Sequence, residues 1–236
     1  MTRKKPSVRD VTERPAYSVG EAAHYLRMSP MTLQSWALGR TYPTASGIKR
    51  WQPLFDIADK RGRRLSFINL VEANVLAAVR RDHGVAMPKV RAALDFVRAE
   101  LDVARPLADE KFETDGVSLF VKRYGELINA SQSGQRALRG MLDAALQRIE
   151  RSAPDGVPVR LYARGPTDAA APSRFVAFDP NIAFGRPILV TSGVPVAAIA
   201  GRFRGGDTIH FLAEDYGVGA EAIEEALRQA ELLRAA

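Results

Sequence analysis

The residue types that most often perform catalysis or bind metal ions are sparse in this sequence. It holds three histidines, His24, His83 and His210, and no cysteine. No paired carboxylate accompanies any of these histidines at the spacing that metal ligands show. The run Ser46–Lys49 has the letters of a Ser-x-x-Lys nucleophile motif, but the companion motifs are absent. We therefore expect no catalytic residue, no metal and no cofactor.

The basic residues indicate a different kind of chemistry, the binding of a polyanion. Residues 1–64 contain thirteen Lys and Arg against five Asp and Glu, a net charge of +8, while the whole chain of 236 residues carries +7. Residues 190–236 contain four against seven. This asymmetry is typical of a nucleic-acid-binding head joined to a part with another role. A basic surface that merely faces solvent is the alternative.

A short segment concentrates four of these positive charges. The run Trp51–Phe67 is interpreted as a β-hairpin whose tip is the sequence Asp59–Arg64. The cations at this tip are Lys60, Arg61, Arg63 and Arg64. Trp51 could stack on a base, but packing of the hairpin against the core is the interpretation we favour.

Two short helices must position the remaining candidates. Ser18 and Glu21 form a capping box that starts the first helix, and Ser29 followed by Pro30 starts the second. The apolar positions of the first helix, at helical spacing, are Val19, Ala22, Ala23 and Leu26, and Leu33 and Trp36 of the second point back to them. A short polar set is left facing outward, with Thr32, Gln34, Ser35 and Arg40 as the candidates for contacts to duplex DNA.

Residues 15–82 resemble the DNA-binding domain of the MerR-type regulators, in which such a helix pair is followed by a basic wing. The resemblance implies that the second helix enters the major groove and that the four cations of the tip contact phosphates. Because two-fold readers of palindromic DNA need matched heads, we expect a homodimer on double-stranded operator DNA. A plain helical hairpin within a core is the alternative.

The pattern downstream is mainly α with an α+β middle. Helices are predicted over residues 68–82, ending at Gly84, and over 88–101. Asp115-Gly116 between Phe112 and Val117–Val121 predicts a hairpin. A helix over 133–151 and a strand over 157–162 follow.

The expected organisation has five parts. They are a flexible basic arm (1–14), a winged helix-turn-helix (15–105), an α+β segment (106–165), a linker (166–174) and a C-terminal helical module (175–236). In this last module a strand at 176–178 precedes three short amphipathic helices, and Asp207 is expected to cap the second of these.

Residues 184–229 resemble a small helical domain found in many proteins regarded as antitoxins of type II toxin-antitoxin pairs. Gly185–Leu189, Pro195-Val196 and Leu212–Gly217 carry the likeness. Members usually have Gly-Thr-Arg before the Pro-Val step, whereas Thr191–Val194 stands here without the arginine, so any role of that arginine is in doubt.

Both ends together resemble the long VapB-like antitoxins. The resemblance implies direct neutralisation of a PIN-type ribonuclease toxin and repression of the antitoxin's own operon. Arg202 and Arg204 could reach into the acidic site of such a nuclease, although arginines beside a helix end more often face solvent.

A ligand-sensing regulator is the second hypothesis. It would place an apolar pocket within residues 111–164. In either case the lack of a signal peptide, of a long apolar run and of cysteine favours a cytoplasmic protein that does not span a membrane.

Overall fold

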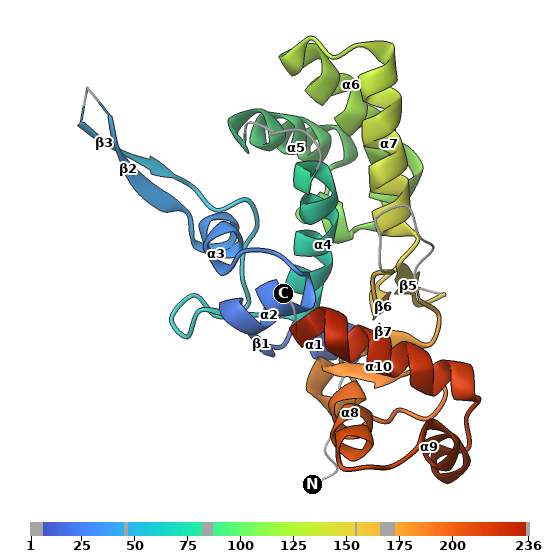
Figure 1. The fold of residues 1–236 in the computed structure, drawn as a ribbon. Coiled ribbons are helices and arrows are strands. Elements are labelled where there is room, and N and C mark those ends of the chain that lie inside the picture. Colours follow the sequence, from blue (N-terminus) through green and yellow to red (C-terminus); the bar gives the residue numbers. More distant parts are fainter. Residues whose placement is uncertain (1–6, 45–46, 82–86, 154, 166–172, 235–236) are drawn as a thin grey trace, which may run out of the picture. The chain divides into compact units, whose positions relative to one another are not determined.

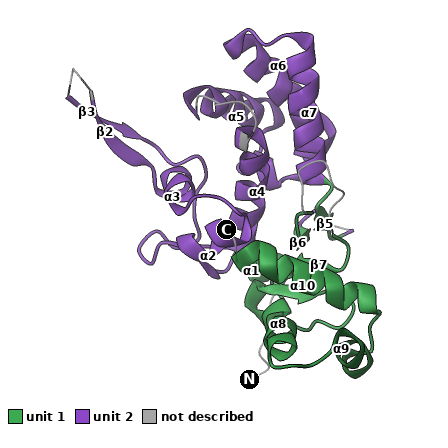
Figure 2. Ribbon diagram, viewed as in Figure 1, with its two compact units in different colours: residues 1–12, 147–152, 158–236 green, residues 13–146, 153–157 purple. Residues whose placement is uncertain are grey.

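A computed structural model describes residues 7–44, 47–81, 87–153, 155–165 and 173–234 (Figure 1). The chain divides into two units (Figure 2). The first, called the head here, comprises residues 13–146 and 153–157. The second, called the tail, comprises residues 1–12, 147–152 and 158–236.

The predicted helix-turn-helix is present in the head. Helix α2 (Val19–Tyr25) begins where the Ser18 Oγ accepts a hydrogen bond from the Glu21 N–H at 3.1 Å, as the capping box requires. Helix α3 (Pro30–Leu38) follows, with Ser29 at its N-cap position but without a capping hydrogen bond from that side chain. Ala22, Ala23 and Leu33 are buried, so the two helices share one small core.

The predicted wing is wrong in its position. The hairpin consists of β2 (Arg40–Thr44) and β3 (Gly47–Trp51), directly after α3, and Figure 1 shows it extending away from that helix. The segment 59–64, expected at the hairpin tip, is instead a tight loop closed by a bridge between Asp59 and Arg64. Beyond it β4 (Arg64–Leu65) pairs with β1 (Tyr17–Ser18), so the loop returns to the start of α2.

The rest of the head is helical. Helices α4 (Phe67–Arg81) and α5 (Met87–Leu101) confirm the predicted pair, while Gly84, the expected helix end, lies outside the described residues. α4 is buried over most of its length and packs against α7 (Gln132–Leu146). A 3₁₀ turn, Pro106–Ala108, follows α5.

The hairpin predicted around Asp115-Gly116 is absent. Residues Phe112–Gly116 form a π-helical turn that leads into α6 (Val117–Ile128). The reason is the helical spacing of Val117, Phe120, Val121 and Tyr124, all of which are buried. That apolar stripe outweighs the local turn preference of the Asp-Gly pair.

The tail contains a four-stranded antiparallel sheet in the order β5-β6-β7-β8. The strands are β5 (Ile149–Arg151), β6 (Pro158–Tyr162), β7 (Val176–Phe178) and β8 (Pro187–Leu189). The three expected helices are confirmed as α8 (Val196–Arg204), α9 (Ile209–Tyr216) and α10 (Ala220–Arg234). They enclose an apolar core with Val176, Leu189 and Ile223 at its centre.

Three further expectations about the tail need correction. Residues 8–12 of the expected flexible arm form α1 (Val8–Thr12), capped by reciprocal hydrogen bonds between Ser7 and Asp10. β5 and β6 precede the expected linker, of which residues 166–172 lie outside the described chain, yet they belong to the same sheet as β7. Helix α9 is capped by Thr208, whose Oγ1 accepts from the Phe211 N–H at 3.2 Å, and not by Asp207.

Candidate nucleic-acid interface

Helix α3 presents a mixed outer face. Gln34 is exposed and Met31 is 80% exposed, whereas Leu33 and Trp36 are buried. Thr32 and Ser35 are half-buried, and the Ser35 hydroxyl donates to the Thr32 carbonyl at 2.8 Å. Of the helix residues predicted to contact DNA, Gln34 is therefore the one whose amide is fully presented to a partner. A side-chain amide of this kind can form a bidentate contact with adenine in the major groove.

The hairpin β2–β3 continues this surface. Arg40, Lys49 and Arg50 are exposed and form no ion pair with any described residue. At the base of the hairpin the rings of Tyr42 and Trp51 meet edge-on, 5.4 Å between centroids. Trp51 is thus half-buried within the hairpin, which agrees with the packing role favoured over base stacking.

Backbone geometry fixes how the hairpin leaves α3. Gly39 has φ +74° and ψ −179°, a conformation open only to glycine, and a Cβ at this position would lie 2.2 Å from the Trp51 carbonyl oxygen. On the exit side, the Leu54 N–H donates to the Trp36 carbonyl at 2.7 Å. Arg91 of α5 donates to the Pro53 carbonyl at 2.8 Å. Backbone contacts therefore hold the base of the hairpin at both ends. The strands themselves have no buried face.

The basic loop 59–64 is tightly organised. The Asp59 carboxylate accepts hydrogen bonds from the N–H groups of Arg61 and Gly62 at 3.0 and 2.9 Å. Lys60 pairs with Asp56 at 2.8 Å on the surface, and the Arg64 guanidinium donates to the Ala16 carbonyl at 2.8 Å. Arg61 and Arg63 are exposed and have no acidic partner among the described residues.

The structure therefore sorts the predicted cations. Arg61 and Arg63 are presented to solvent, Lys60 is shared with a carboxylate, and Arg64 holds the loop to the segment before α2. Sequence reasoning missed Lys49 and Arg50, because it placed the hairpin at residues 51–67. The sequence signal was present in Gly47, whose φ of +112° suits a turn between two short strands.

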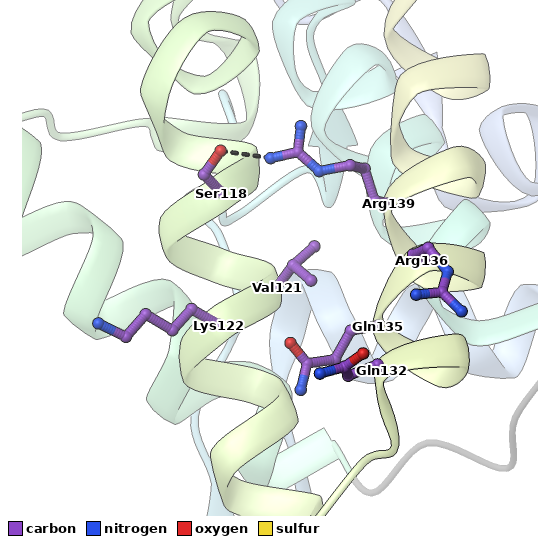
Figure 3. A pocket seen from close by; sticks show the side chains of 7 residues that line it. All are labelled: Ser118, Val121, Lys122, Gln132, Gln135, Arg136 and Arg139. Atoms are coloured by element: carbon purple, nitrogen blue, oxygen red, sulfur yellow. Dashed lines mark hydrogen bonds between the residues drawn. The ribbon is translucent and has the colours of Figure 1, made fainter.

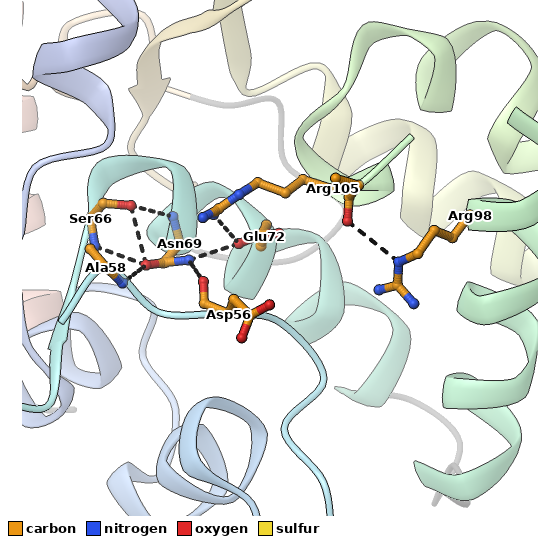
Figure 4. Close-up of polar contacts among 8 residues, drawn as sticks. Asp56, Ala58, Ser66, Asn69, Glu72, Arg98 and Arg105 are labelled. Carbon is orange, nitrogen blue, oxygen red and sulfur yellow. Dashed lines mark hydrogen bonds and ion pairs between the residues drawn. The ribbon is translucent and has the colours of Figure 1, made fainter. Parts of the chain in front are cut away.

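A buried polar cluster supports the loop from beneath (Figure 4). The Asn69 Oδ1 accepts from the N–H groups of Ala58 and Ser66, at 3.1 and 3.0 Å. Its Nδ2 donates to the Asp56 carbonyl at 2.7 Å and to the Glu72 carboxylate at 2.9 Å. One asparagine near the start of α4 thus holds both the segment that enters the basic loop and the one that leaves it.

Glu72 is the unusual member of this cluster. Its carboxylate is buried, and its ionic partner is Arg105 at 3.3 Å. Burial raises the pKa of Glu72 to about 7, against the lowering effects of Arg105 and of the hydrogen bond from Asn69. The sequence signal was a Ser66-Asn69-Glu72 set at helical spacing inside an apolar run.

In the tail, Arg202 is occupied by its own unit. Its Nε donates to Asp207 at 2.6 Å and its Nη1 donates to Asp215. The guanidinium also lies over the rings of Phe211 and Tyr216, 5.5 and 5.1 Å from their centroids. The hydrogen bond to Asp215, followed by those to Tyr216 and Asp207, raises the pKa of Arg202 above its ordinary value. Arg204 is exposed and donates to the Ala200 carbonyl at 2.9 Å.

The described residues also bear on the other hypotheses. No group of three or more His, Cys, Asp or Glu side chains among them is arranged to hold a metal ion. A cleft does lie within the segment proposed to sense a ligand, between α6 and α7, but polar and cationic side chains line it together with one apolar residue, Val121 (Figure 3). None of the helices described is long and apolar enough to cross a membrane.

Comparison with known proteins defines first the class of the head. A family model described as "Putative DNA-binding HTH domain" matches residues 15–94, in agreement with the α2–α3 geometry. A second model, "Protein of unknown function (DUF433)", matches residues 176–230 of the tail.

The particular family follows from whole-chain relatives. The chain is 32% identical over 232 residues to a protein of Mycobacterium tuberculosis described as "Putative antitoxin VapB45", with 90% of this chain and 92% of that protein covered. It therefore belongs to the VapB45-like antitoxin family, which confirms the expected combination of a helix-turn-helix head with an antitoxin-type tail.

Two further proteins of Mycobacterium tuberculosis are similar. The uncharacterised protein Rv2308 is 26% identical over 95% of this chain and 94% of its own length. The crystal structure of Rv2018 has 27% identity and a TM-score of 0.65, and the match covers 91% of this chain and 98% of that one. The match therefore spans the residues of both units.

Proposed function

We propose that this chain is an antitoxin that binds operator DNA through its head and neutralises a PIN-type ribonuclease by direct contact, acting in the cytoplasm as a homodimer. The observation that carries the DNA part is the exposed side of α3. Gln34 is presented there, and a hairpin with Arg40, Lys49 and Arg50 follows at once. A polar helix flanked by cations suits base contacts in the groove and phosphate contacts beside it.

The structure suggests a division of labour among the candidates. Gln34 serves as the residue that contacts a base. Thr32 and Ser35 serve as further DNA contacts at the edge of the exposed face of α3. Arg40, Lys49, Arg50, Arg61 and Arg63 serve as phosphate contacts, while Lys60 and Arg64 hold the loop in place as well as adding charge. Phosphate contacts of this kind position a protein on DNA without reading sequence.

The test is binding of the purified full-length chain to the DNA upstream of its own gene, followed by fluorescence anisotropy. Gln34→Ala should weaken binding by about tenfold or more, because one bidentate base contact contributes about 1–3 kcal/mol. Gln147→Ala, which alters an exposed glutamine of the tail, is the matched control. If Gln34→Ala and Arg61→Ala both bind like the unaltered chain, α3 and the basic loop do not contact the operator.

The toxin part of the proposal rests on the family. Family membership implies a cognate toxin, and neutralisation by contact needs no catalytic group in this chain. Among the two arginines considered for toxin contact, Arg204 is the one with an exposed guanidinium that no described carboxylate engages, whereas Arg202 is held by Asp207 and Asp215.

Co-expression with the product of the neighbouring gene tests this part directly. Growth rescue together with co-purification of the two proteins is expected. A toxic neighbour that neither binds the chain nor is relieved by it would overturn the antitoxin assignment while leaving DNA binding intact.

A further inference from the structure

The head contains a polar cleft outside the residues assigned above to DNA and toxin contacts. It has a volume of about 350 Å³ and lies between α6 and α7 (Figure 3). The residues that line it are Ser118, Val121, Lys122, Gln132, Gln135, Arg136 and Arg139. A volume of this size lies in the range of small-molecule sites, which run from about 300 to 1,000 Å³.

The lining follows from the periodicity of the two helices. Positions 118, 121 and 122 fall on one face of α6, and positions 132, 135, 136 and 139 fall on one face of α7, at spacings of three and four residues. Phe120 of α6 and Leu142 of α7 are buried and do not line the cleft. Apart from Val121, which belongs to the buried stripe of α6, the residues of the two helices that line the cleft are polar or cationic.

Close packing marks one end of the cleft. A Cβ on Gly125 of α6 would lie 2.9 Å from the Gln135 Cδ, so the helices nearly touch there. At Ser118, seven residues before Gly125, the contact between the two helices is polar. The Arg139 guanidinium of α7 donates there to the Ser118 hydroxyl of α6. This bond holds one of the cations in a defined place at the wall of the cleft.

The charge of the cleft is entirely of one sign. Arg136 and Arg139 lie on its α7 side, and Lys122 lies on its α6 side with the ammonium directed away from α7. None of the seven lining residues carries a carboxylate, and neither arginine forms an ion pair with a described residue. Gln132 and Gln135, in the first turn of α7, also line the cleft. Like charges gathered in a concave site raise the local potential and favour an anion.

From these observations we propose that the cleft between α6 and α7 binds a small phosphorylated ligand, the phosphate of which is held by Arg136 and Arg139. Guanidinium groups match phosphate oxygens with paired hydrogen bonds, and the Gln132 and Gln135 amides and the Ser118 hydroxyl offer neutral partners to the rest of the ligand. This proposal goes beyond the antitoxin function and stands independently of it.

The experiment measures binding of ATP, inorganic pyrophosphate and adenosine to the full-length chain by calorimetry at low salt. ATP and pyrophosphate should bind saturably, and adenosine, which lacks phosphate, should not. Arg136→Gln/Arg139→Gln should weaken both phosphorylated probes by about tenfold or more, since both charge-assisted contacts are lost. Lys89→Gln/Lys111→Gln removes the same charge from exposed positions of the head outside the cleft and should bind as the unaltered chain does.

Each other outcome overturns the proposal. The proposal is wrong if ATP and pyrophosphate do not bind saturably. It is also wrong if Arg136→Gln/Arg139→Gln and Lys89→Gln/Lys111→Gln bind these probes with equal affinity. Displacement of ATP by a short duplex of unrelated sequence, with duplex binding that depends on Arg136 and Arg139, would make the cleft a nucleic-acid contact instead. Unchanged thermal unfolding of the cleft variant, measured alongside, shows that lost binding is not lost folding.

Discussion

The arginines proposed to contact DNA in the head differ from Arg202 in the tail. In the tail, Arg202 is satisfied by Asp207, Asp215 and two aromatic rings, and so it fastens α8 to α9. In the head, Arg40, Arg50 and Arg61 stand exposed without a carboxylate among the described residues. A guanidinium that is paired with carboxylates of its own chain is not available to bind an external anion. A guanidinium without such a partner is available. In the proposed function these exposed arginines of the head contact DNA, whereas Arg202 has a structural role in the tail.

The strongest way to break this comparison is to disturb how the head presents its hairpin. Gly39→Ala places a side chain in a backbone conformation reserved for glycine and against the Trp51 carbonyl oxygen. We expect a loss of about 3 kcal/mol or more in the free energy of unfolding of the head, together with loss of operator binding. Denaturant titration followed by tryptophan fluorescence measures it, because both tryptophans, Trp36 and Trp51, belong to the head.

Gly20→Ala is the matched control for that variant. Gly20 lies in α2, and a Cβ there meets no atom within 4 Å. The exchange should therefore be neutral or stabilise the head by up to about 1 kcal/mol, as alanine does in a helix. Equal destabilisation by both variants would contradict the special role of Gly39.

A second, smaller effect concerns the buried cluster beneath the basic loop. The pKa of Glu72 is about 7 in the folded head against 4.5 for an ordinary glutamate, so the folded state holds a proton that the unfolded chain releases. This contribution to stability is fully present below pH 4.5 and is lost as the pH rises through 7. The change amounts to at most about 3 kcal/mol by linkage.

Glu72→Gln should remove this pH dependence, since glutamine does not titrate. Fluorescence-detected unfolding across the pH range measures the slope, and Glu100→Gln, on the exposed side of α5, should retain it. A Glu72→Gln variant with the same slope as the unaltered head would show that other groups set the pH response.

A third prediction sharpens the contrast in arginine use. Lys49→Gln/Arg50→Gln should weaken operator binding by about tenfold at low salt and should reduce the salt dependence by about one unit of slope for each lost phosphate contact. Arg202→Gln/Arg204→Gln removes the same charge from the tail. Anisotropy titrations at several salt concentrations should leave the slope of that tail variant unchanged; equal losses would mean that only net charge matters.

The smallest expected effect is on the tail alone. Arg202→Gln breaks the ion pairs that join α8 to α9, and so the melting temperature of the tail should fall slightly while operator binding is retained. Arg204→Gln should have no such effect, because Arg204 has no ion pair with the described residues. Circular dichroism together with anisotropy separates the two results.

Local signals in the sequence were sufficient for the helix-turn-helix and the tail helices. Ser18 with Glu21, and the spacing of Leu33 and Trp36, describe contacts within a few residues, and the structure contains them. The strand at 176–178 was likewise predicted from a short apolar run.

Non-local competition decided the elements that were missed. The β2–β3 hairpin has no buried face, so its sequence lacks the alternation of apolar residues that predicts a strand. Pro43 also lies in its first strand. Asp115-Gly116 does favour a turn, but burial of the apolar stripe of α6 favours a helix more strongly. The network of Asn69 and Glu72 depends on Ala58 and Arg105, partners that only the folded chain brings near.

The makeup of the tail has a consequence for biosynthesis. Its segments come from both sides of the head in the sequence, and α1 contacts β6, which follows it by more than a hundred residues. During synthesis the head is complete before most strands of the sheet that α1 contacts have been made. The head should therefore fold first and the tail last. A chain that ends before α10 would then contain a folded head and an unfolded tail.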